Sequence, residues 1–212
     1  MRTIFIAVLA VCLGRVVLRH VRGEPNWIAI AVLIAPLGWL SVSEYRHRQV
    51  MTTLEAAAGE IAHHPVEVRC ASIVSTHTEL GWVQFNEDGD PARHTDIAHS
   101  VCGDLSDYIH GHQANPTRDQ VIAVHVLAHE AEHLAGFTGE ADAECYSVQV
   151  TAHVAERLGA TPRQASALAA RYWDEMYPDV PSDYQSDQCR DGGTLDLNRR
   201  DTNWPTPAVA PV

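Results

Sequence analysis

Residues 129–133 read His-Glu-Ala-Glu-His, and this pattern carries the clearest chemistry in the chain. On an α-helix the two histidines lie on one face, one turn apart, so both imidazoles can bind a single zinc ion. Glu130 lies about 100° round the helix from His129, where it can reach a water at the metal without being a ligand. The segment therefore predicts that His129 and His133 bind zinc and that Glu130 acts as the catalytic base.

A catalytic zinc site needs a third protein ligand, and acidic residues follow the histidines closely. Glu140 and Glu144 stand one helical turn apart and share a face of the next expected helix. A short turn between the helices lets the second fold back against the first. His125 lies one turn before His129, where we expect it to support the site or to pack rather than to bind metal.

The sequence around these residues resembles the gluzincin class of zinc metallopeptidases, in which a glutamate on the helix after HExxH completes the metal site. Residues 140–144 read EADAE, which is similar to the ExxA(D/E) pattern of ImmA/IrrE-type and HtpX-type peptidases. The resemblance covers mainly residues 121–149. It implies that Glu140 is the third zinc ligand and that Glu144 orients a histidine. The short spacing after His133 leaves the opposite assignment, with Glu144 as the ligand, open.

The predicted function is therefore a zinc metallopeptidase that hydrolyses peptide bonds with a zinc-activated water and Glu130 as general base. By the resemblance, the strand at residues 81–85 is expected to pair with an extended peptide or protein substrate. The candidates for stabilising the oxyanion are Tyr146, Tyr172, Tyr177 and His153. The alternative from another class is a noncatalytic zinc-binding or pseudopeptidase module of the cell envelope, for which a fourth ligand such as Cys145 or His125 would be the sign.

Helices and a small sheet must position these residues. Thr117 and Gln120 form a capping-box pattern, apolar residues continue to Leu134, and Gly136 ends the helix. Further helices are expected at residues 51–63, from 95 to 111, at 140–158 and from 162 to 176, and strands at 66–74 and 80–85. The pattern predicts an α+β, zincin-like domain over residues 51–190, followed by a disordered tail at 191–212.

The N-terminal fifty residues differ from the rest in charge. Six Arg against two Glu give +4 through residue 50, whereas nine Arg against 25 acidic residues give −16 beyond it. The apolar runs at 3–13 and 27–42 predict a membrane anchor of one or two transmembrane helices in residues 1–50, and the first run also fits a signal peptide. The acidic remainder excludes nucleic acid as a partner, because phosphate contacts need clustered basic residues.

Basic residues between the two apolar runs favour a cytoplasmic loop there, which predicts a protein of the cell membrane with the catalytic domain on the extracytoplasmic side. Four cysteines in that domain agree with an oxidising exterior. They allow three pairings, of which we favour Cys70 with Cys102 and Cys145 with Cys189. An inward-facing body acting as an intracellular regulatory protease would instead keep these cysteines reduced.

Overall fold

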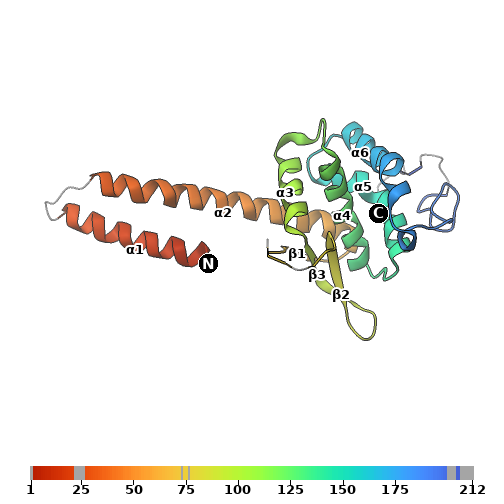
Figure 1. Ribbon diagram of the computed structural model, residues 1–212, viewed down its shortest axis with the longest axis horizontal. Helices are drawn as coiled ribbons and strands as arrows, with labels where there is room; N and C mark the ends of the chain where they lie inside the picture. Colours follow the sequence, from red (N-terminus) through yellow and green to blue (C-terminus); the bar gives the residue numbers. More distant parts are fainter. Residues whose placement is uncertain (1, 22–26, 73, 76, 200–203, 206–212) are drawn as a thin grey trace. The chain divides into compact units, whose positions relative to one another are not determined.

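The computed structural model describes residues 2–21, 27–72, 74–75, 77–199 and 204–205 (Figure 1). The chain forms two compact units, Met1–Gln49 and Val50–Val212. Helix α1 (Arg2–Val21) belongs to the first unit, and helix α2 (Trp27–Ala62) begins in the first and ends in the second. The second unit holds every residue to which the sequence assigns chemistry.

The transmembrane region predicted for residues 1–50 is wrong. Within the residues that the structure describes, none of the helices combines the length and the apolar character that crossing a bilayer requires. The apolar runs of α1 and α2 are each shorter than the roughly 20 residues of a span, and a charged residue stands two positions after each of them, Arg15 and Glu44. The localisation at the cell membrane, with the catalytic domain on its extracytoplasmic side, depended on this anchor and is overturned with it.

The sheet of the second unit has three strands in the order β1-β3-β2. Strand β3 (Pro91–Ile97) lies in the middle, parallel to β1 (Glu67–Cys70) and antiparallel to β2 (Gly81–Phe85). The α+β class and the small sheet are therefore confirmed. The sequence does not predict the central strand, because its residues PARHTDI are mostly polar and the helix expected from the apolar pattern begins at Thr95.

Four helices complete this unit: α3 (His99–Asp107), α4 (Arg118–Leu134), α5 (Glu140–Arg157) and α6 (Pro162–Glu175). Short helical turns follow α3 at Tyr108–His112 (η1) and α6 at Tyr177–Asp179 (η2) and Ser182–Tyr184 (η3). The predicted capping box of α4 is confirmed, since Thr117 accepts from the Gln120 amide and the Gln120 side chain accepts from the Thr117 amide. Gly136 has φ +106°, a conformation that favours glycine and lets the chain turn back into α5.

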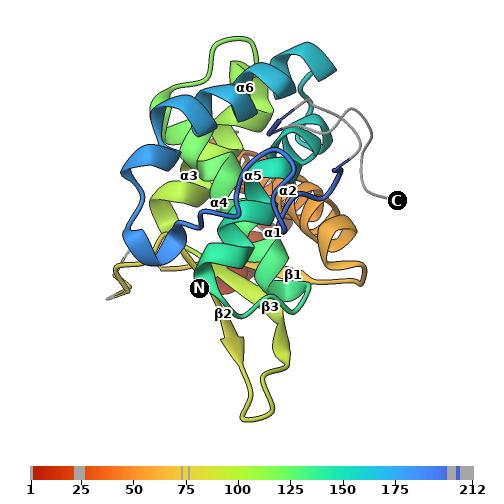
Figure 2. The same ribbon diagram turned by 90° about the vertical axis from the view of Figure 1, so that its right-hand side faces the viewer.

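Helix α4 lies at the centre of the second unit (Figure 2). It packs against α3, α5 and α6 and against strands β2 and β3. From Gln120 to Leu134 every residue except Ile122 is buried, because neighbours cover the helix on all sides. The polar residues of the HExxH segment are thus held inside the protein, where each needs a partner or a cavity.

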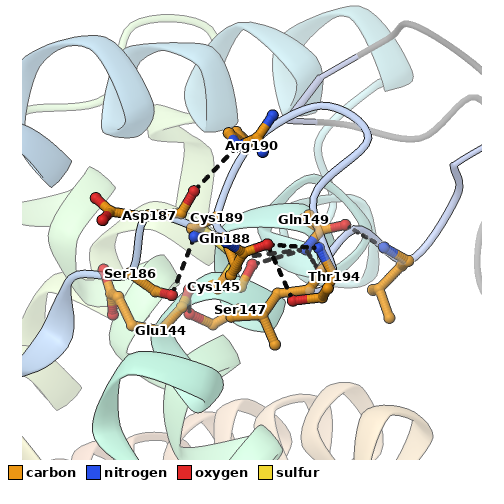
Figure 3. Close-up of a disulfide and its surroundings, with 12 residues drawn as sticks. Glu144, Cys145, Ser147, Gln149, Ser186, Asp187, Gln188, Cys189, Arg190 and Thr194 are labelled. Atoms are coloured by element: carbon orange, nitrogen blue, oxygen red, sulfur yellow. Dashed lines mark hydrogen bonds between the residues drawn. A yellow bond between two sulfur atoms is a disulfide. The ribbon is translucent and has the colours of Figure 1, made fainter.

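Two disulfides tie this unit together, Cys70 to Cys102 and Cys145 to Cys189. These are the pairings that the sequence favours, and disulfides are typical of an oxidising compartment. The second bond fastens the segment after α6 to α5 (Figure 3). Beyond it, Gln149 of α5 donates to the Leu195 carbonyl and accepts from the Leu197 amide, which holds the described start of the predicted tail. Residues 200–203 and 206–212 of that tail lie outside the described residues.

Removing the second disulfide should destabilise the protein substantially. The double variant Cys145→Ala, Cys189→Ala frees a loop with a sequence separation of 44 residues, and loop-closure entropy predicts a loss of about 4 kcal/mol in the free energy of unfolding. Denaturant unfolding under nonreducing conditions measures this loss. The matched control is Cys12→Ser, because Cys12 is a free, exposed thiol and its replacement should leave the unfolding midpoint unchanged. Equal midpoints for all three proteins would contradict the structural role of the bond.

Candidate metal centre

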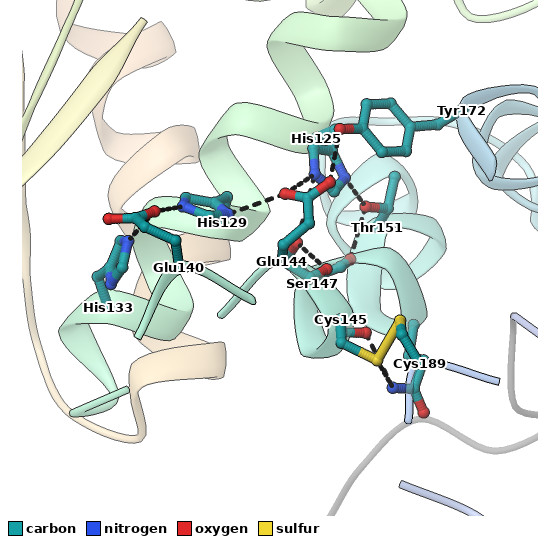
Figure 4. A network of polar contacts seen from close by, with 11 residues as sticks. His125, His129, His133, Glu140, Glu144, Cys145, Ser147, Thr151, Tyr172 and Cys189 are labelled. Atoms are coloured by element: carbon teal, nitrogen blue, oxygen red, sulfur yellow. Dashed lines mark hydrogen bonds and ion pairs between the residues drawn. A yellow bond between two sulfur atoms is a disulfide. The ribbon is translucent and has the colours of Figure 1, made fainter. Parts of the chain in front are cut away.

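Three side chains converge where α4 meets the first turn of α5. Glu140 Oε2 lies 3.1 Å from His129 Nε2 and 3.3 Å from His133 Nε2 (Figure 4). The ligand atoms of these residues all lie within 4.8 Å of one another, close enough to hold one metal ion. Two imidazole nitrogens and a carboxylate oxygen are also the donor set of catalytic zinc sites. The geometry thus fits the residues predicted from the sequence.

The Nδ1 atoms of His129 and His133, the ring nitrogens that do not contact Glu140, each have a hydrogen-bond acceptor. His129 Nδ1 lies 3.0 Å from Glu144 Oε2, and His133 Nδ1 lies 2.6 Å from the carbonyl oxygen of Phe137. With Nδ1 donating to these oxygens, each neutral ring keeps its Nε2 lone pair for a metal. Glu140 and Glu144 therefore contact opposite nitrogens of His129, and Glu140 is the one that reaches both Nε2 atoms.

Glu144 is the hub of a buried polar network behind the histidines. Its Oε1 accepts a 2.7 Å hydrogen bond from the Tyr172 hydroxyl, and its Oε2 lies 2.9 Å from His125 Nε2. Burial alone would raise the pKa of Glu144, but the attraction of His125 and the hydrogen bonds from His125 and His129 outweigh it and hold this pKa far below its usual range. His125, His129 and Glu144 also form a second group with metal-binding geometry, so His129 belongs to both groups.

His125 is itself fixed on every side. Its Nδ1 lies 3.0 Å from Thr151 Oγ1, and its ring stacks on that of Tyr172 with centroids 3.5 Å apart. Burial lowers the pKa of His125, although the neighbouring Glu144 raises it in part. These contacts hold His125 against Glu144. Thr151 and Tyr172 supply partners in this network that no motif indicates.

The Glu130 carboxyl lies against strands β2 and β3 of the sheet. The Thr95 hydroxyl of β3 lies 3.3 Å from Glu130 Oε2 and 3.1 Å from the carbonyl oxygen of Trp82, so these two acceptors share its one proton. Burial raises the pKa of Glu130 to about 7, although His129 and the Thr95 bond partly lower it. A Cβ at Gly81 would lie 2.7 Å from Glu130 Oε1, so the side chain has room only because residue 81 is glycine. The sequence indicates neither the contact of Thr95 with Glu130 nor that of Gly81, which is expected only as part of the strand that pairs with substrate.

A cleft of about 600 Å³ opens over these residues. The metal group and Glu130 form part of its wall, and strand β2, further residues of α4 and the segment from Met176 to Tyr184 also line it. The Tyr184 ring stacks on His129 with centroids 5.5 Å apart, and the Tyr184 hydroxyl contributes to lowering the pKa of Glu140, after the larger effect of the His129 hydrogen bond. Tyr184 was also missed, because nothing near it in the sequence marks it.

The residues predicted to stabilise the oxyanion do not all reach this cleft. Tyr146 and His153 line a different cavity. Tyr172 lines the cleft, but its hydroxyl is committed to Glu144. Tyr177 is not among the residues found to line it. Cys145 is bonded to Cys189 and is therefore excluded as a soft metal ligand.

No protein-family model, curated protein or solved structure matches this chain. Buried His and Glu side chains that can hold a metal ion are what the structure establishes. Their chemistry has to be inferred from their own geometry.

The full chain should bind about one zinc ion. The loss of zinc affinity on substitution should be larger for a ligand than for a residue that orients a ligand. His133→Ala removes a ligand and should abolish tight binding. Glu144→Gln removes the charge that orients His129 and should weaken binding about 10–100-fold. Competition with a chromogenic chelator measures the affinity, with the exposed His99→Ala as the control that leaves it unchanged. Retention of zinc by His133→Ala would instead place the metal at the group of His125, His129 and Glu144.

Proposed function

We propose that this chain is a zinc-dependent peptidase with a gluzincin-like site, formed by His129, His133 and Glu140. One observation carries the proposal: the three ligand atoms converge in the wall of a cleft that Glu130 also lines, and Glu130 is buried there. A metal site that only stabilised the fold would be closed by a fourth ligand. Among the described residues, this group contains no fourth His, Cys, Asp or Glu, and its open side meets the cleft.

The metal's role would be electrostatic. A zinc ion held by these residues supplies a Lewis acid that polarises a carbonyl and lowers the pKa of water. Glu144 keeps His129 oriented for it, and the Phe137 carbonyl does the same for His133.

Glu130 moves the proton in this mechanism. Its carboxylate takes a proton from the attacking water and then delivers it to the departing amine. The Thr95 hydroxyl and the glycine at position 81 hold the carboxyl in its place between α4 and the sheet. The Tyr184 hydroxyl, whose pKa burial raises to about 12, stays protonated at neutral pH. It hydrogen-bonds Glu140 in this structure, and once it turns from that carboxylate it can donate to the developing oxyanion.

A peptide substrate is supported by strand β2. This strand pairs with β3 on one side and is an edge of the sheet, and four of its five residues line the cleft. An extended peptide laid along β2 can exchange backbone hydrogen bonds with it, which places a peptide bond near the metal group.

Glu130→Gln should bind zinc as tightly as the unchanged protein and lose hydrolysis by at least about 100-fold, because the amide cannot accept the proton. Incubation of the zinc-loaded full chain with a diverse peptide library, read by mass spectrometry, measures cleavage and its sequence preference. Glu156→Gln, at an exposed carboxylate on α5, is the matched control and should cleave normally. Cleavage that persists in Glu130→Gln would refute the assigned base, and zinc-loaded protein that cleaves nothing in the library would favour the noncatalytic module.

Tyr184→Phe should lower kcat by about 100-fold and change KM little, since the hydroxyl is assigned to the transition state and the ring remains. Zinc affinity measured by chelator competition should stay within about twofold. Steady-state kinetics on a peptide selected from the library separates the two parameters. A rise in KM with an unchanged kcat would show that Tyr184 binds substrate instead.

A further inference from the structure

A second cavity of about 470 Å³ lies beside α4, and none of the residues lining it is shared with the metal cleft. Its walls come from the end of α2, from α4 and α5, and from the C-terminal segment. Ile61 and Val150 form buried apolar wall, while Phe137 and Leu197 are exposed large apolar side chains that also line it. This volume is within the range of small-molecule sites, which are mostly apolar with few polar groups.

Glu132 supplies a polar group in this cavity. The residue is only 5% exposed, yet its carboxyl has no hydrogen-bond or ion-pair partner in the part of the chain that the structure describes. Buried carboxyl groups are normally paired, because leaving one unpaired costs free energy. An occupant that donates to Glu132 would remove that cost.

Glu60, the other acidic residue that lines the cavity, already has partners. Glu60 accepts from His153 at 2.9 Å and from Arg157 at 2.5 Å. His63 has φ +58°, the left-handed conformation that non-glycine residues rarely adopt. None of the hydrogen bonds and ion pairs found among the described residues involves Glu132, so its carboxyl is open to a donor from an occupant of the cavity.

Aromatic rings complete the chemistry. Phe137 and Tyr146 contact each other with ring centroids 4.6 Å apart, and both line the cavity. Aromatic faces attract ammonium and guanidinium groups, and they repel anions. A carboxylate, two aromatic rings and apolar walls together match a positively charged head on an apolar chain.

We propose that this cavity binds an alkylammonium or alkylguanidinium group, with the cationic head on Glu132 and the alkyl chain against Ile61 and Val150. The same chemistry is offered by a small organic amine and by a lysine or arginine side chain of a peptide. The proposal does not depend on peptidase activity, since it uses none of the metal or cleft residues.

NMR titration of the full chain tests this site with n-butylguanidinium and with its uncharged isostere n-butylurea. The cation should bind and shift the amide signals of Phe137, Tyr146 and Leu197, and the urea should bind at least about tenfold more weakly. A blocked Gly-Arg-Gly peptide forms a second arm: tighter binding of the peptide identifies a side chain as the occupant, and tighter binding of the free cation identifies a small molecule.

Glu132→Gln should weaken binding of the cation at least about tenfold, since a charge-assisted hydrogen bond is lost. Phe137→Ala, at an exposed side chain that is not part of the core, should weaken it two- to fivefold and keeps the test independent of core folding. Glu140→Gln should leave binding unchanged, which separates this cavity from the metal centre. No binding to the unchanged protein, equal binding of the urea, or full binding by both Glu132→Gln and Phe137→Ala would overturn the proposal.

Discussion

The contact between His129 and Glu144 is the interaction on which the rest of the second unit depends. It joins α4 to α5 through a hydrogen bond between two buried groups, with Nδ1 and Oε2 3.0 Å apart. A buried carboxylate is costly unless charges and donors surround it, and Glu144 has His125, His129 and Tyr172 from α4 and α6. The same contact directs His129 Nε2 to Glu140. The contacts that join the three helices therefore also set the geometry of the metal group.

The disulfide between Cys145 and Cys189 extends this arrangement to the cleft. Cys145 directly follows Glu144 on α5, so the bond fastens the segment after α6 next to the hub of the network. Tyr184 lies within that segment and stacks on His129. Met176 anchors the start of this segment in the core, and Tyr177 packs against that core. The disulfide fixes the other end of the segment, beyond Tyr184.

Local patterns explain which parts of this structure the sequence predicts. The boundaries of α4, α5 and α6 follow from capping residues and glycines adjacent in the chain, and HExxH spacing brings His129 and His133 together because a helix repeats every 3.6 residues. Thr95, Gly81 and Tyr184 reach the site through strand pairing and a disulfide, so no local signal marks them. The anchor prediction failed because short apolar runs suffice for a helix and not for a span.

The burial of α4 also explains why two cavities flank it. Residues 130 and 132 are about 200° apart on a helix, so their side chains leave on opposite sides. A helix with a solvent face would expose one of them, but α4 is covered on both sides and both glutamates are buried. Burial raises the pKa of Glu130 to about 7 and that of Glu132 to about 8, which shows that the fold bears a cost at each. The hydrogen bond with Thr95 offsets part of the cost of burying Glu130. Glu132 instead faces a cavity that has room for a partner.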